Sequence, residues 1–141
     1  MIEHTCVSLI MREIARTKFG LFSVIVFGKQ HIYGLEHVPQ TGVISPPNLR
    51  AGTYKIVQIN QRDDGSSWVL LNTHCDTTPT IASNHAPIMH DDNIGVGADI
   101  GCVHGMWGLV KTKDGRDTFG DWINKAEKIS ITIVRNDKLN I

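Results

Sequence analysis

The residues best suited to chemistry lie in the most glycine-rich stretch of the chain, between residues 90 and 105. His90 stands twelve positions before Cys102, and Gly101 directly precedes that cysteine. A cysteine acts as a nucleophile in its thiolate form, and a free thiol, with a pKa of about 8.5, needs a neighbouring base near neutral pH. A glycine lets the backbone approach a substrate closely. The spacing therefore predicts Cys102 as a nucleophile, with His90 as the nearest base.

The same residue types allow two other interpretations. A free cysteine is often a small buried core residue, in which case Gly101 only forms a turn. Zinc is the second alternative, because nitrogen and sulfur ligands suffice for a tetrahedral site. The available ligands are His74, Cys75, His90, Cys102 and His104. Their spacing matches no zinc ribbon or finger, and adjacent residues on a strand point to opposite faces, so we expect no metal and no cofactor.

Acidic and amide side chains near these glycines favour turns over a calcium site. They are Asp91, Asp92, Asn93 and Asp99. The string lacks the EF-hand pattern and its closing glutamate, whereas Asp, Asn and Gly are common turn formers. We therefore expect a turn-rich segment here.

Two further residue types have a structural and a functional interpretation. Trp68, Trp107 and Trp122 could stack on sugars, but the tryptophans of a small β protein more often fill its core. Glu36 could orient a histidine, but an exposed charge at a strand end is the commoner outcome. In both cases we expect the structural role.

Short strands must position all of these residues. Period-two alternation predicts strands over residues 5–12, 19–27, 31–35, 52–59, 68–71 and 129–135, with a hairpin turn at Gly28-Lys29 and loops at 39–47, 63–66 and 73–86. A turn at 114–117 precedes a helix capped by Asp117 or Thr118 that runs through Ala126, and residues 11–17 could coil as a second one. This pattern indicates a mainly β fold, a small β-sandwich or partly open barrel with one or two short helices, in a single domain spanning residues 1–141.

Composition narrows the possible partners and compartments. Fourteen basic and fourteen acidic side chains cancel, which disfavours nucleic acid as a partner. The most apolar stretch, residues 21–27, is shorter than the roughly twenty residues of a membrane helix, and no secretory signal is visible at the first residues. Cys6, Cys75 and Cys102 form no CxxC pair, so we expect reduced thiols and synthesis in a cytosol.

Several short motifs occur in one order along the chain. They are residues 9–13, residues 17–21, Leu35-Glu36, residues 52–54, the region of His90 and Asn93, and Gly101-Cys102-Val103 with Gly105. Together they resemble the phage and bacterial DUF5675 family over about residues 7–135. That family has no established activity, so the resemblance implies a β-rich fold and a phage or prophage origin.

A second, more distant resemblance rests on Gly52, His90, Gly101, Cys102 and Val103. These residues are similar to the signature of the L,D-transpeptidase catalytic domain, although Asp99-Ile100 replaces its Ser-His pair and His104 replaces its arginine. The resemblance implies that Cys102 attacks an amide carbonyl of a peptidoglycan stem after His90 takes its proton. It also implies that backbone N–H groups around Gly101 and Cys102 hold the oxyanion. We expect Gly101, His104 and Asn93 to form the substrate site.

Two functions of different classes follow from these observations. The first is a phage-encoded, cysteine-dependent domain that acts on cell-wall peptides, with Cys102 and His90 as catalytic residues. The second is a non-catalytic virion protein of a tail, baseplate or capsid surface, which packs against other virion chains or against further copies of itself. Both place the protein in the host cytoplasm after synthesis, the second also in the virion, and neither involves nucleic acid or a membrane.

Overall fold

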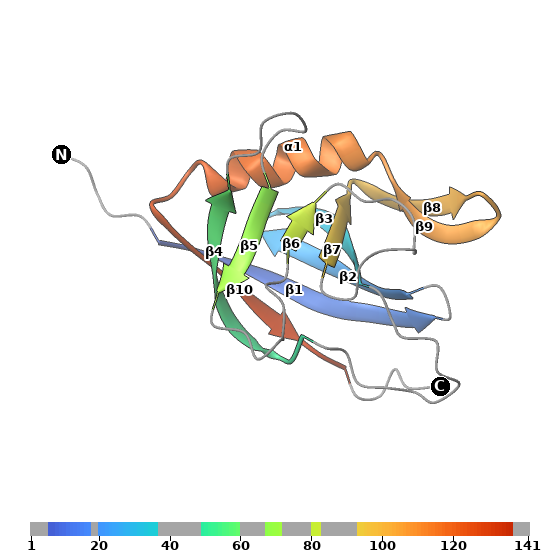
Figure 1. Ribbon diagram of the computed structural model, residues 1–141, viewed down its shortest axis with the longest axis horizontal. Helices are drawn as coiled ribbons and strands as arrows, with labels where there is room; N and C mark the ends of the chain where they lie inside the picture. The colour runs from blue at the N-terminus through green and yellow to red at the C-terminus, as the bar shows by residue number, and fades with distance from the viewer. Residues whose placement is uncertain are drawn as a thin grey trace.

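A computed structural model describes residues 6–17, 20–36, 49–59, 67–71, 80–82 and 93–136 of the chain. These residues form ten strands and one helix, with the N-terminal strands and the C-terminal strand in one curled sheet and the helix across one end of it (Figure 1). The elements in chain order are β1 (Cys6–Thr17), β2 (Gly20–Phe27), β3 (Gln30–Glu36), β4 (Gly52–Ile59), β5 (Ser67–Leu71), β6 (Thr80–Ala82), β7 (Asn93–Gly97), β8 (Asp99–Val103), β9 (Met106–Val110), α1 (Thr112–Ile123) and β10 (Lys128–Val134).

Eight of the strands form a barrel in the order β1-β10-β4-β5-β6-β7-β3-β2, and β2 pairs back onto β1. The β1–β10 and β6–β7 pairs are parallel, and the other pairs are antiparallel. Strands β8 and β9 pair with each other in a separate hairpin. The structure thus confirms the predicted mainly β fold, a small curled sheet with a short helix.

Alternation of side chains decides which face of each strand lies inside the barrel. In β10, Ile129, Ile131 and Ile133 are buried, while the hydroxyls of the intervening residues point outward. Thr132 hydrogen-bonds Thr53 of β4 across the strand pair at 2.9 Å. A polar outer face and an apolar inner face are typical of an antiparallel sheet with one side in solvent.

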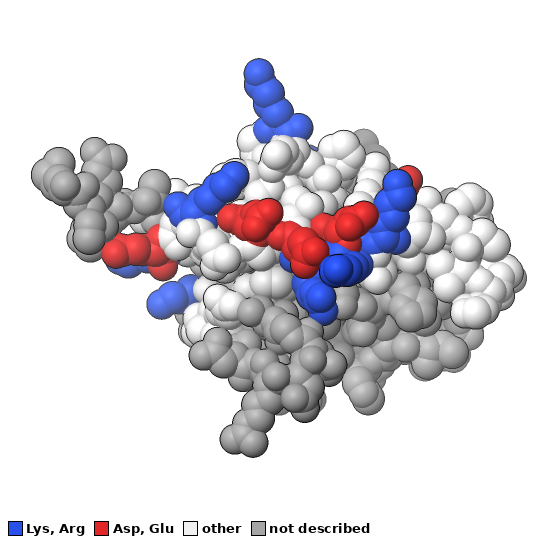
Figure 2. Space-filling model, turned by 90° about the horizontal axis from the view of Figure 1, so that it is seen from above, with Lys and Arg blue, Asp and Glu red and all other residues white. Residues whose placement is uncertain are grey.

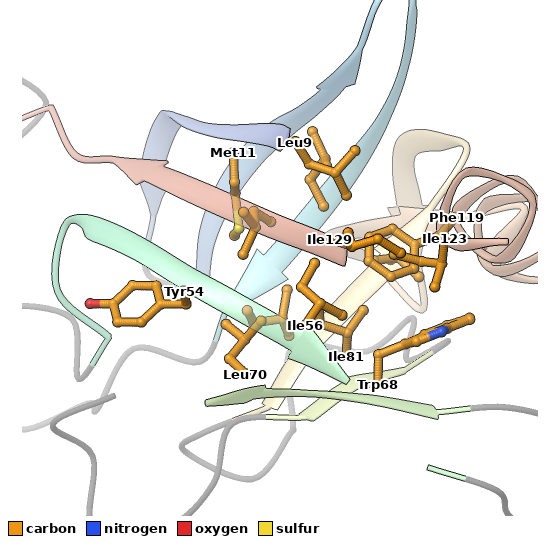
Figure 3. Close-up of a cluster of buried hydrophobic side chains, with 14 of the residues drawn as sticks. Leu9, Met11, Tyr54, Ile56, Trp68, Leu70, Ile81, Phe119, Ile123 and Ile129 are labelled. Carbon is orange, nitrogen blue, oxygen red and sulfur yellow. The ribbon is translucent and has the colours of Figure 1, made fainter. Parts of the chain in front are cut away.

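Aromatic side chains close the barrel at the end where β1 and β10 begin. Phe119 and Trp122 of α1 are fully buried, and the Phe119 ring meets that of Trp68 edge-on at 4.8 Å between centroids. Trp122 donates its Nε1–H to Oε1 of Gln30 at 2.6 Å. Figure 3 shows Phe119 and Trp68 in one cluster with aliphatic residues of the barrel wall. The helix is therefore part of the hydrophobic core.

Helix α1 begins earlier than the sequence predicts. Asp117 and Thr118 do not cap it, and the expected turn at residues 114–117 is helical. The helix follows Lys111, whose φ of 52° is left-handed, and the N–H of Gly115 donates to the carbonyl of Lys111 at 3.0 Å. The tertiary packing of this stretch on β7 outweighs the preference of its residues for a turn.

Two other local predictions were wrong. Residues 11–17 do not coil but continue β1, with a bulge between Glu13 and Ala15 where the strand pairs with β2. The loop predicted at 73–86 contains β6, which pairs with β5 and β7. The loops predicted at 39–47 and 63–66 lie outside the described residues.

Candidate functional site

Cys102 lies on the hairpin formed by β8 and β9, opposite Trp107 of β9. Its side chain is exposed, and that of Trp107 is 57% exposed. This contradicts the alternative in which Cys102 is a buried core residue. The structure instead presents the thiol to solvent beside a large aromatic ring.

Apolar contacts at its base attach the hairpin to the barrel wall. Leu109 of β9 is fully buried against Phe22 and Leu35, and Ile100 of β8 packs on the same cluster. The N–H of Ala98 donates to the carbonyl of Lys111 at 3.1 Å, which ties the two ends of the hairpin together. In Figure 1 the hairpin leaves the wall near α1 and projects away from the barrel.

Gly101 and His104 occupy different parts of this hairpin. Gly101 lies within β8 rather than in a turn, and a Cβ atom there would lie 3.0 Å from Cγ1 of Val110. His104 is exposed and forms the tip turn with Gly105, with positive φ angles of 51° and 79°. The hairpin thus brings together Gly101, Cys102 and His104.

The other two predicted site residues are not on this hairpin. Asn93 begins β7, next to the end of β3, because Glu36 and Ile94 are register partners. In Figure 1 the start of β7 lies at the end of the barrel away from α1, whereas β8 points outward beside α1. His90 lies outside the described residues. Its pairing with Cys102 and the roles of both residues stay predictions.

A buried ionic cluster fills the end of the barrel where β1, β3 and β10 finish. Arg135 donates from Nη1 and Nη2 to the two carboxylate oxygens of Glu36, both at 2.8 Å. Its Nε also donates to the carbonyl of Leu49 at 3.1 Å, and Nη1 lies 3.8 Å from Oε2 of Glu13. Glu13 in turn pairs with the guanidinium of Arg16. The negative charges of two carboxylates are therefore balanced by the positive charges of two guanidiniums. The side chains of Glu13, Glu36 and Arg135 in this cluster are almost fully buried.

Sequence reasoning missed most of this cluster. Glu36 was expected to be an exposed charge, but it is 5% exposed and held by Arg135. Glu13 continues the inward register of Leu9 and Met11, so its burial could have been noticed from the alternation alone. Arg16 is only three residues from Glu13, but nothing along the chain indicated that Arg135 and Glu36 would join them, since both are far away in sequence.

The tryptophans divide between the core and the surface. Trp68 and Trp122 are buried, as expected, but the prediction for Trp107 was wrong. Trp107 belongs to a stretch, residues 100–110, that contains no Asp, Glu, Lys or Arg. Figure 2 shows blue and red side chains intermixed over the face that carries α1, while the region at the right of the view is free of both. Beyond Asp99, the exposed first residue of β8, the hairpin is therefore uncharged and carries an exposed aromatic residue.

Within the ranges that the structure describes, no three or more His, Cys, Asp or Glu side chains gather where they could hold a metal ion. The described part of the chain also has no helix of the length and apolarity needed to cross a bilayer. His74 and Cys75, two of the potential zinc ligands, lie outside it.

No protein-family model, curated protein or solved structure matches this chain.

Proposed function

We propose that the chain is a cysteine-dependent domain that acts on peptide bonds of cell-wall peptides, with Cys102 as the nucleophile. The observation that carries the proposal is the exposure of the Cys102 side chain on a hairpin whose base is fixed to the barrel. A nucleophile must reach its substrate and hold its position, and an anchored hairpin can meet both needs.

In the proposed reaction, His90 takes the proton of the Cys102 thiol, and the sulfur attacks the carbonyl carbon of a peptide amide. The tetrahedral oxyanion accepts hydrogen bonds from backbone N–H groups near Gly101. The C–N bond then breaks, the leaving amine takes the proton from the imidazolium, and the acyl group stays on sulfur as a thioester. Water or a second amine attacks the thioester carbon and loses a proton to His90. The C–S bond then breaks and releases the acyl product, and the Cys102 thiolate takes the proton from the imidazolium.

The hairpin supports this chemistry with two further features. A Cβ at Gly101 would lie 3.0 Å from Cγ1 of Val110, so the glycine lets the backbone beside Cys102 pack closely on β9. Trp107, directly across from Cys102, offers an apolar surface on which an aliphatic part of a peptide can lie.

Selective alkylation tests the proposal, because Cys6 is an exposed thiol in the same molecule and serves as an internal control. With limiting iodoacetamide near neutral pH, we expect Cys102 to be alkylated about tenfold faster than Cys6, since a base beside the thiol can take its proton as the sulfur attacks. His90→Ala should remove this difference and leave the rate at Cys6 unchanged. Peptide mapping by mass spectrometry measures both rates. Equal rates at the two thiols in the unaltered protein would refute the catalytic role.

The uncharged outer part of the hairpin, residues 100–110, favours a second candidate function, a non-catalytic virion component that packs against other virion chains. Exposed tryptophans are enriched in protein interfaces, and Trp107 is the large hydrophobic residue with the highest exposure among the described residues.

This alternative predicts that the protein co-purifies with particles of its phage in fixed stoichiometry. Trp107→Ala should reduce incorporation about thirtyfold, because truncation of a buried interface tryptophan often costs about 2 kcal/mol or more. Val57→Ala, which trims an exposed residue of β4, should leave incorporation unchanged. Quantitative mass spectrometry of purified particles measures both. Absence of the protein from particles would exclude this function.

A further inference from the structure

The outer face of β2 differs from the outer faces of β10 and β4. Where β10 presents Ser130 and Thr132, β2 presents Phe22, Val24 and Val26. The inner face of β2 carries Leu21 and Ile25, with the buried Ser23 between them. A contiguous apolar patch on the outer face of a strand marks a binding surface more often than single apolar residues do.

The β8–β9 hairpin covers only one end of this face. Leu109 packs on Phe22, whereas the part of the face that carries Val24 and Val26 is left as an open groove of about 390 Å³. Its walls include Ile14 of β1 and Tyr33 of β3. Ile14 is 39% exposed and lines the groove together with Val24 and Val26.

The polar residues of the groove lie at the β2–β3 turn. Lys29 supplies a cation and His31 a ring nitrogen, and none of the described residues that line the groove is acidic. The ring of His31 meets that of Tyr33 edge-on at 5.4 Å, with Nε2 3.4 Å from the tyrosine hydroxyl. Gln30 is held by its hydrogen bond from Trp122. The groove is thus apolar along its floor, and at the turn it favours negative charge.

We propose that this groove binds a short extended segment of a partner protein, with apolar side chains on Ile14, Val24 and Val26 and an acidic residue beside Lys29. The charge at the turn matches an acidic group, and the volume lies at the lower end of the range of small binding sites, which suits a few side chains. The site is separate from Cys102 and does not depend on the proposed catalysis.

Two fluorescein-labelled pentapeptides test the proposal by fluorescence anisotropy. Both begin with leucine-valine-leucine, and one ends in two aspartates while the other ends in two lysines. We expect the acidic peptide to bind about tenfold more tightly at low salt, with the difference shrinking at high salt as the charges are screened. Equal binding of the two peptides, or binding of neither, would overturn the proposal.

Variants locate the binding. Lys29→Glu should reverse the preference between the two peptides, and because Lys29 is exposed in a turn this change leaves the fold intact. Val26→Asp should weaken binding of the acidic peptide at least about tenfold, since it places a like charge on the groove floor. Val57→Asp makes the same change at an exposed valine of β4 and should have no effect, and neither should Cys102→Ser. An equal loss in Val57→Asp and Val26→Asp would overturn the proposal.

Analytical ultracentrifugation distinguishes the partner segment from a second copy of the chain. We expect the protein to stay monomeric at the concentrations used for binding. Self-association that Val26→Asp abolishes would show that another copy covers the groove, and would overturn the partner-segment proposal.

Discussion

Replacing Arg135 with methionine is expected to lower the free energy of unfolding by about 3–5 kcal/mol, because removal of one partner leaves an uncompensated buried charge. Glu36 would lose both of its charge-assisted hydrogen bonds, and the carbonyl of Leu49 would lose its donor. Methionine retains much of the apolar volume of the arginine stem, so the loss of stability comes mainly from the missing ionic contacts.

Urea denaturation followed by circular dichroism measures this change. Arg12→Met is the matched control, because Arg12 is an exposed arginine on β1 and its replacement should alter stability by less than about 0.5 kcal/mol. A loss of the same small size for Arg135→Met would contradict the view that the cluster holds this end of the barrel together. Replacing Glu36 and Arg135 together by leucine and methionine should cost less than Arg135→Met alone, because no charge is then left without its partner.

The strands were predictable because their signal is local. Each inward isoleucine of β10 alternates with an outward hydroxyl residue, and β4 was predicted with its observed bounds. The buried ionic cluster was not predictable, because it depends on the register of strands that are distant in sequence. Alternation could have placed Glu13 inside the barrel, but only the parallel pairing of β1 with β10 brings Arg135 to it.

In the candidate site, too, the local features were predictable from the sequence and the tertiary features were not. Sequence alone grouped Gly101, Cys102 and His104, and the structure keeps them on one hairpin. The exposure of Cys102 was not evident, because an apolar stretch without charged residues resembles a core strand. Cys102 is exposed because β8 and β9 pack on the barrel only at the base of the hairpin and then project away from it. This tertiary arrangement leaves no pattern in the local sequence.

Gly115 explains why the start of α1 was also mispredicted. The segment Asp114-Gly115-Arg116-Asp117 has the composition of a turn, yet it forms the first turns of the helix. A Cβ atom at Gly115 would lie 2.5 Å from the backbone of Gly97 in β7. The glycine is therefore required because the helix approaches the strand closely. The amino-acid composition alone does not show whether a glycine serves such a close contact or a turn.

Gly115→Ala is expected to lower the free energy of unfolding by about 2 kcal/mol, although alanine favours a helix by about 1 kcal/mol over glycine. The clash is with backbone atoms of Gly97, which no side-chain rotation can relieve, so α1 must shift away from β7 and loosen the contact between Phe119 and Trp68.

Gly120→Ala is the matched control in the same helix. There the new Cβ would lie 3.4 Å from the Trp68 ring, an ordinary contact, so the helix preference should leave stability unchanged or raise it by up to about 1 kcal/mol. Thermal and urea unfolding of both variants measure the difference, and near-ultraviolet circular dichroism reports the tryptophan environment. Equal stability of the two variants would show that α1 does not depend on the glycine at position 115 to reach the barrel.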